Sequence, residues 1–129
     1  DYAASLLERF ELDDKKDKLG KELSKGMQQK LSICCALLHR PKAVIFDEPL
    51  VGLDPHAIKE LKEMFRKLKR DGASVLISTH MIDSVEDYWD VANIMMNGRF
   101  AATKFNDGSE GQSLEDLFFA ITEGNQAEG

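Results

Sequence analysis

Polar side chains that could handle a phosphate group follow two short apolar runs of the sequence. Asp47 and Glu48 come directly after the run at 43–46, and His80 comes shortly after the run at 74–78. The Asp47 carboxylate could bind Mg²⁺, and Glu48 could orient and deprotonate a water that attacks a phosphate. The His80 imidazole could hydrogen-bond a phosphate oxygen. Each also has a plainer interpretation, because Asp-Glu can begin a surface loop and a single histidine is more often structural.

A third segment, Leu23-Ser24-Lys25-Gly26-Met27, stands immediately before a predicted helix. A serine hydroxyl, a glycine that permits close approach and the N–H groups of a helix N-terminus can together bind an anion. Ser24 is also a good N-cap, and an N-cap needs no ligand. Taken alone, this segment favours a capped helix, with anion binding as the alternative.

Two strands and a helix must position the carboxylates and the histidine. The runs at 43–46 and 74–78 are short, continuous and apolar, which is typical of parallel strands buried on both faces. Between them, Asp54 as N-cap and Pro55 at the first helical position begin a helix. Strand, helix, strand normally makes a parallel crossover. Ligands of such sheets lie at the carboxyl ends of the strands, so the polar groups are expected at one edge.

Apolar residues at helical spacing predict the other helices of the first eighty residues. One helix is expected at 3–10, and another begins at Ser24 and stops at Pro41. The expected buried stripes are Leu6, Leu7 and Phe10; Met27, Leu31, Cys34 and Leu38; and, after Pro55, Ile58, Leu61, Phe65 and Leu68. The charges at 11–18 and the basic residues of 59–70 are interpreted as solvated surface, not as a nucleic-acid patch.

The remaining residues predict a hairpin between two helices. A short acidic helix is expected at 82–88, before strands at 91–96 and 99–103. Asn97-Gly98 joins these strands, because both positions of the tight hairpin turn need φ > 0. Ser113 opens a final helix through a capping-box pattern.

Length and charge limit the classes of protein to which the chain can belong. Its 129 residues suit one domain, and 17 Lys+Arg against 23 Asp+Glu give a net charge of −6. This acidic balance disfavours a general nucleic-acid binder. A hydrophobic content of 43% is too high for a disordered tail, and no apolar run approaches the roughly 20 residues of a membrane span.

The two cysteines, Cys34 and Cys35, are adjacent in an apolar run. Neighbouring residues rarely have disulfide geometry, and a metal site would need more ligands than nearby His39 supplies. We therefore expect two small buried side chains in a reducing compartment.

Four motifs in order carry a resemblance to a known family. They are Leu-Ser-x-Gly-x at 23–27, Val-Ile-Phe-Asp-Glu-Pro at 44–49, Gly-Leu-Asp-Pro at 52–55 and Ser-Thr-His at 78–80. Together they resemble the nucleotide-binding domain of ABC transporters. The resemblance implies an α/β fold: part of a P-loop NTPase core of the ABC ATPase type, with parallel strands, crossover helices, a signature helix, and a C-terminal hairpin and helix.

The resemblance also implies a role for each matched residue. Leu23, Ser24, Lys25, Gly26, Met27 and Gln28 would form the signature loop, which reaches the γ-phosphate of an ATP held mainly by the other subunit. Asp47 would be the Walker B ligand of Mg²⁺, Glu48 the catalytic glutamate, and His80 the switch histidine. Gly52, Leu53 and Asp54 would form the D-loop. Lys25 and Met27 stand where the commonest signature has glycine and glutamine, and Gln28 follows them.

One expected motif, the P-loop Gly-x-x-x-x-Gly-Lys-Ser/Thr, does not occur in the sequence. The only Gly-Lys, Gly20-Lys21, is followed by Glu22, and Lys15 stands where the first glycine should be. We therefore expect a C-terminal portion of a larger domain. Its expected parts are 1–40, the end of a helical subdomain with the signature helix; 41–103, the Walker B, D-loop and switch-histidine core; and 104–129, a loop, helix and tail.

The implied function is that of an ATP-hydrolysing subunit that uses ATP and Mg²⁺ to drive transport. Its implied partners are a second nucleotide-binding domain, identical or different, and transmembrane permease subunits at the inner face of the cell membrane; no nucleic acid is expected. Residues 113–121 resemble the C-terminal helix of export-type, ABC-2-like systems. Without the P-loop, the chain alone is expected to be inactive, and its exposed strand edges are expected to favour self-association. The alternatives are a soluble ABC-type ATPase of translation, DNA repair or chromosome maintenance, and a non-enzymatic interaction module.

Overall fold

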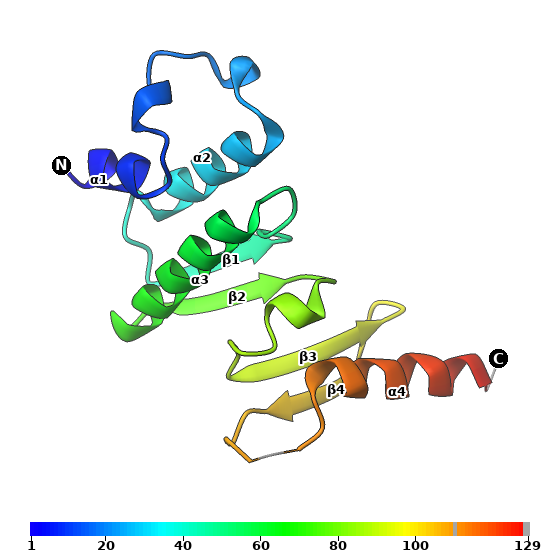
Figure 1. The fold of residues 1–129 in the computed structure, drawn as a ribbon. Coiled ribbons are helices and arrows are strands. Elements are labelled where there is room, and N and C mark those ends of the chain that lie inside the picture. The colour runs from blue at the N-terminus through cyan, green and yellow to red at the C-terminus, as the bar shows by residue number, and fades with distance from the viewer. Residues whose placement is uncertain (110, 128–129) are drawn as a thin grey trace. The chain divides into compact units, whose positions relative to one another are not determined.

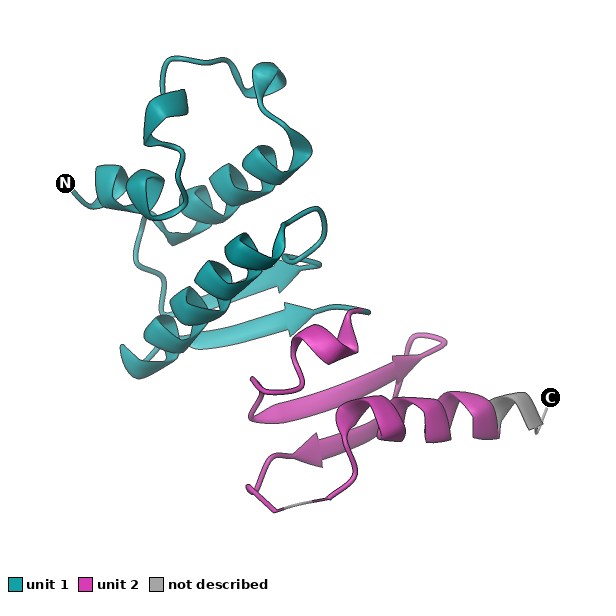
Figure 2. Cartoon of the chain, in the orientation of Figure 1, with its two compact units in different colours: residues 1–80 teal, residues 81–129 magenta. Residues whose placement is uncertain are grey.

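A computed structural model describes residues 1–109 and 111–127. The elements in chain order are α1 (Tyr2–Arg9), η1 (Asp13–Lys15), η2 (Gly20–Glu22), α2 (Lys25–Leu37), β1 (Ala43–Asp47), α3 (Pro55–Arg70), β2 (Ser74–Ser78), η3 (Ile82–Ser84), β3 (Val91–Met96), β4 (Arg99–Phe105) and α4 (Leu114–Ala127), as Figure 1 shows. The chain forms two compact units, Asp1–His80 and Met81–Gly129, coloured separately in Figure 2.

The first unit is built on a parallel pair of strands. β1 and β2 pair in register from Ala43 opposite Ser74 to Asp47 opposite Ser78. The connecting helix α3 covers one face of the pair (Figure 1), and the rings of Phe46 and Phe65 lie 4.9 Å apart there. The prediction that these two strands are parallel is thus confirmed. Their carboxyl ends lie at the same edge of the sheet.

The prediction that both strands are buried on both faces is wrong. Val44 and Phe46 are buried beneath α3, but Ile45, which lies between them in β1, faces the other way. Ile45 is 74% exposed, and its cross-strand partner Leu76 is 58% exposed. The reason is that a two-stranded sheet has two faces, and α3 covers only one of them among the described residues of this unit.

Helix α3 begins as its sequence predicts. The Asp54 carboxylate accepts a hydrogen bond from the Ala57 N–H at 2.8 Å, with Pro55 in the first turn. Just after the helix, Gly72 adopts φ +90°. The buried residues are Ala57, Leu61, Met64, Phe65 and Leu68, whereas the predicted Ile58 is half-buried.

Helix α2 is capped by Ser24, whose Oγ accepts from the Met27 N–H at 3.2 Å. Its buried face differs from the predicted stripe, because Ile33, Cys34 and Leu37 are buried and Leu38 is 43% exposed. Leu38 is the C-cap residue with a helical backbone, φ −58° and ψ −36°, and it points about 100° around the helix from buried Leu37. The expectation for the cysteines holds for Cys34 only. Cys35 is exposed, since successive helical residues point about 100° apart.

The second unit contains the predicted hairpin. β3 and β4 are antiparallel, and Asn97 and Gly98 adopt φ of +51° and +74° in the turn. The predicted helix at 82–88 is wrong, because only the 3₁₀ turn η3 forms there. The Glu86 carboxylate instead accepts from the Leu114 N–H at 2.9 Å, where a negative charge is favourable at the N-terminus of α4. Ser113 caps α4 as predicted, accepting from the Asp116 N–H.

Among the described residues, no helix combines the length and the apolar character that crossing a bilayer requires.

Candidate functional site

Glu48 leaves the end of β1 in an unusual backbone conformation. Its φ is +48°, a left-handed value that a residue with a side chain adopts at a cost of about 1–3 kcal/mol. Its N–H donates to the Ser78 carbonyl at 2.8 Å, so it extends the β1–β2 hydrogen bonding by one residue. Such conformations persist where neighbouring contacts impose them. The left-handed backbone of Glu48 turns its side chain toward the end of β2.

The Glu48 carboxylate is held by the two residues that follow β2. Oε1 accepts from the backbone N–H of His80 at 2.9 Å and lies 2.6 Å from His80 Nδ1. Oε2 accepts from Thr79 Oγ1 at 3.0 Å. A carboxylate has about four acceptor positions, so these contacts leave capacity for a water molecule. The His80 side chain is 78% exposed and can reach a ligand on the solvent side.

These contacts also set the proton affinity of Glu48. Burial by itself raises the pKa of this carboxyl, but hydrogen bonds from the His80 ring, the His80 N–H and Thr79 together hold its pKa below the ordinary value of 4.5. The group is therefore an anion at neutral pH. It is suited to accept a hydrogen bond from an attacking water and to orient that water.

Asp47 lies beside Glu48 and is held from the opposite strand. Ser78 Oγ donates to Asp47 Oδ1 at 2.5 Å, across the last register pair of the sheet. The Asp47 side chain is exposed at the carboxyl end of β1. No cluster of three or more His, Cys, Asp or Glu suited to a metal occurs within the described residues. One carboxylate with a hydroxyl beside it fits Mg²⁺, which commonly takes one or two carboxylates and completes its shell with water and phosphate oxygens.

The signature segment, residues 23–28, leads into α2 and forms its first turn. Ser24 and Lys25 are exposed, while Leu23, Gly26 and Met27 are half-buried. The first N–H groups of an α-helix have no intrahelical acceptor, so this end can receive an anion. Gln28 points back to the preceding turn, with its Nε2 donating to the Gly20 carbonyl at 2.9 Å.

The D-loop segment runs from β1 to α3 and touches the signature segment. Gly52 has φ +79°, Leu53 is half-buried and Asp54 caps α3. A Cβ placed on Gly26 would stand 2.8 Å from the Gly52 carbonyl oxygen, so the two backbones are in close contact. The fold thus brings together two motifs that are 26 residues apart.

Three residues of the site received no role from sequence reasoning. Ser78 and Thr79 hold Asp47 and Glu48, as described above, and their position beside His80 at a strand end was a usable signal. Gln29 of α2 donates from Nε2 to the Pro49 carbonyl at 3.1 Å and to the Glu48 carbonyl at 3.4 Å. Gln29 lies outside the four sequence motifs. Its contact depends on how α2 packs against the turn after β1.

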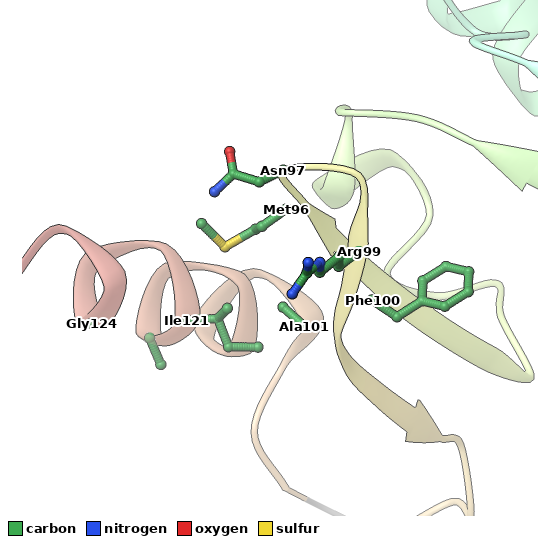
Figure 3. A pocket seen from close by; sticks show the side chains of 8 residues that line it. Met96, Asn97, Arg99, Phe100, Ala101, Ile121 and Gly124 are labelled. Carbon is green, nitrogen blue, oxygen red and sulfur yellow. The ribbon is translucent and has the colours of Figure 1, made fainter. Parts of the chain in front are cut away.

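A separate hollow of about 790 Å³ lies in the second unit between the hairpin and α4, as Figure 3 shows. Met96, Phe100 and Ile121 contribute to its walls. Among the described residues that line it, Arg99 alone carries a charge. Its described lining therefore offers no pair of acid and base groups.

Comparison with known proteins identifies the family. Residues 4–82 match a family model described as "AAA domain, putative AbiEii toxin, Type IV TA system". The "Uncharacterized ABC transporter ATP-binding protein YthP" of Bacillus subtilis (strain 168) is 37% identical over 96% of this chain. A solved structure described as the ATP-binding subunit of an ABC transporter superposes with a TM-score of 0.86 at 38% identity, over 94% of this chain. The chain belongs to the ABC transporter ATP-binding family.

The matches cover only part of each related ABC protein. The chain spans 55% of YthP and 53% of the solved ATP-binding subunit, which is about half their length. It also matches the "Lantibiotic transport ATP-binding protein SrtF" of Streptococcus pyogenes, with 41% identity over 76% of this chain and 42% of that protein. The ABC ATP-binding fold predicted from the four motifs is thereby confirmed.

Proposed function

We propose that this chain forms the part of an ATP-hydrolysing ABC transporter subunit that carries the catalytic glutamate and the signature loop. The observation that supports this most is the Glu48 carboxylate, which Thr79 and His80 hold at the carboxyl ends of two parallel strands. A surface loop would have no need of a left-handed glutamate with three polar contacts. The same edge carries Asp47, the group best suited to Mg²⁺.

Each residue of this edge has a task in phosphoryl transfer. Glu48 accepts a hydrogen bond from the attacking water and aligns it with the γ-phosphate, while exposed His80 binds a phosphate oxygen. Asp47, held by Ser78, would bind Mg²⁺, which when present neutralises charge on the phosphates. The Thr79 hydroxyl keeps the Glu48 carboxylate in place.

The signature and D-loop segments are proposed to meet a second nucleotide-binding domain, identical or different. Ser24, Lys25 and the N-terminal amides of α2, with Gly26, would bind the γ-phosphate of an ATP held mainly by that partner. Leu23, Met27 and Gln28 would shape this loop. Gly52, Leu53 and Asp54 would face the partner across the dimer.

We infer that the remaining phosphate contacts come from another part of the parent protein. The relatives are about twice as long, and the chain has no P-loop sequence. The functional division into 1–40, 41–103 and 104–129 stays a prediction, as does the inactivity of the chain alone.

The proposed partners of the parent are transmembrane permease subunits, reached from the cytoplasmic side of the membrane. SrtF, by its name, serves lantibiotic transport. We propose an export system, because the helix that begins after Ser113 resembles that of export-type systems.

Calorimetric titration with Mg-ATP tests the proposal at two levels. The 129-residue chain should release no binding heat at micromolar ATP and show no turnover. The parent protein should hydrolyse ATP, and Glu48→Gln should abolish turnover while ATP binding persists. A parent that neither binds nor hydrolyses ATP would refute the proposed function. Micromolar affinity with turnover in the short chain would refute its predicted inactivity.

A further inference from the structure

One side chain of α2 reaches the backbone from which Glu48 projects. The Gln29 Nε2 lies 3.1 Å from the Pro49 carbonyl oxygen and 3.4 Å from the Glu48 carbonyl oxygen. Gln29 is half-buried, so water competes less for this amide than it would at the surface. The contact spans 19 and 20 residues of sequence, and it joins the signature helix to the turn after β1.

The Glu48 and Pro49 carbonyls need a donor from outside the sheet, because both residues follow the end of β1. β1 ends at Asp47, and the left-handed backbone of Glu48 turns the chain away from the β2 ladder. Pro49 is among the most deeply buried side chains. The local donor to the Glu48 carbonyl, the Val51 N–H, is at 3.5 Å, longer than an ordinary hydrogen bond. The Gln29 contact with the Glu48 carbonyl is also long, at 3.4 Å, whereas its 3.1 Å contact with the Pro49 carbonyl is an ordinary hydrogen bond.

Gly26 makes a second contact between the same two segments. It lies one helical turn before Gln29, so both are on one face of α2. Its backbone meets the Gly52 carbonyl at a distance that leaves no room for a side chain. The turn at 48–52 is thus attached to α2 near both of its ends, and a shift of α2 must move the turn.

We propose that Gln29 is a positioning residue for Glu48, and that it transmits the position of the signature helix to the catalytic carboxylate. This inference rests on the proposed function. In the proposed dimer, the N-terminus of α2 binds an ATP held by the partner, whereas Glu48 acts on the ATP of its own subunit. Gln29 therefore links the two nucleotide sites within one chain.

Hydrogen exchange of the 129-residue chain tests the structural half of the proposal. Gln29→Met keeps the length of the side chain but removes the donor, and Gln29→Lys keeps a donor. The Glu48 N–H bonds to the Ser78 carbonyl, and the His80 N–H bonds to the Glu48 carboxylate. Both amides should exchange about fivefold faster in Gln29→Met, as expected for one lost hydrogen bond. Gln29→Lys should restore the wild-type rates. Ser32→Ala, on an exposed position of α2, is the matched control and should change neither amide.

Kinetics of the assembled parent test the functional half. Gln29→Met should lower kcat by about 10- to 100-fold, the effect of a slightly misplaced catalytic group, with KM for ATP unchanged within about twofold. Gln29→Lys should recover most of kcat. Unchanged Glu48 exchange in Gln29→Met, or a loss of kcat that Lys does not rescue, would overturn the proposal. If the wild-type parent hydrolyses no ATP, the proposed function fails, and exchange still decides whether Gln29 holds Glu48.

Discussion

The backbone of Gly26, in the first turn of α2, packs directly against the carbonyl oxygen of Gly52. A Cβ added to Gly26 would stand 2.8 Å from that oxygen, closer than real side chains approach. This contact is backbone against backbone, so no flexible side chain can yield. The glycine of the signature segment is therefore needed for packing within one subunit, independently of any nucleotide.

Gly26→Ala should destabilise the first unit by about 1–3 kcal/mol, the usual cost of forcing an extra group into a packed contact. Urea denaturation followed by circular dichroism measures this. Gly20→Ala is the control, because a Cβ there meets no atom within 4 Å. Equal stabilities for the two variants would show that the Gly26 contact relaxes at no cost.

Thr79→Val should remove the hydrogen bond to Glu48 Oε2 while preserving the shape of the side chain. The expected loss is about 1–2 kcal/mol in the free energy of unfolding, since the acceptor is charged. Thr79→Ser keeps a hydroxyl and should lose less. If Thr79→Val is no more destabilising than Thr79→Ser, the hydrogen bond contributes no more to stability than the methyl group does.

The stability conferred by Glu48 should depend on pH. Although burial opposes it, hydrogen bonding to His80 and Thr79 makes the folded-state pKa of Glu48 lower than the unfolded value of about 4.5. The contribution is therefore fully present above that value and is lost as the pH falls through the lowered folded pKa. Comparing wild type with Glu48→Gln by urea denaturation between pH 7 and pH 3 isolates this group. The difference between them should shrink below pH 4.5, and a constant difference would contradict the assignment.

The uncovered sheet face should favour self-association of the 129-residue chain. Ile45 and Leu76 are neighbours across the strands and are 74% and 58% exposed. Ile45→Lys should lower the mass measured by light scattering at high concentration, because it places a charge on this face. Leu19→Lys changes another exposed apolar residue, 61% exposed and outside the sheet, and should have no effect. A monomeric wild type at all concentrations would contradict the expectation.

The two cysteines should differ in reactivity. Burial, with a smaller effect of neighbouring Cys35, raises the pKa of Cys34 to about 11, whereas Cys35 is exposed. Because the thiolate is the reactive form, iodoacetamide at pH 8 should add one group to the native chain and two to the denatured chain. Intact mass spectrometry counts the adducts. Cys35→Ser should leave the native protein unmodified, and rapid modification of Cys34 would show that its burial is transient.

Helix caps and a tight turn show which features can be predicted from local sequence. The cap at Asp54 with Pro55, the cap at Ser24 and the turn at Asn97-Gly98 all appear where predicted. The acidic stretch after His80 was predicted less well, because Glu86 serves the N-terminus of α4, 28 residues away, instead of a helix of its own.

Sequence by itself determined most of the strands, helices and turns, and the order of motifs that indicates the ABC family. Those features depend on residues a few positions apart, whose sterics and hydrogen bonds are local. Only the tertiary structure decided that Glu48 bonds to Thr79 and His80, that Gln29 holds the Glu48 backbone, and that Ile45 is uncovered. These contacts join residues 19 to 32 positions apart, or depend on which element covers a sheet face. They follow from strand register and helix packing, in which distant segments choose among several compatible neighbours.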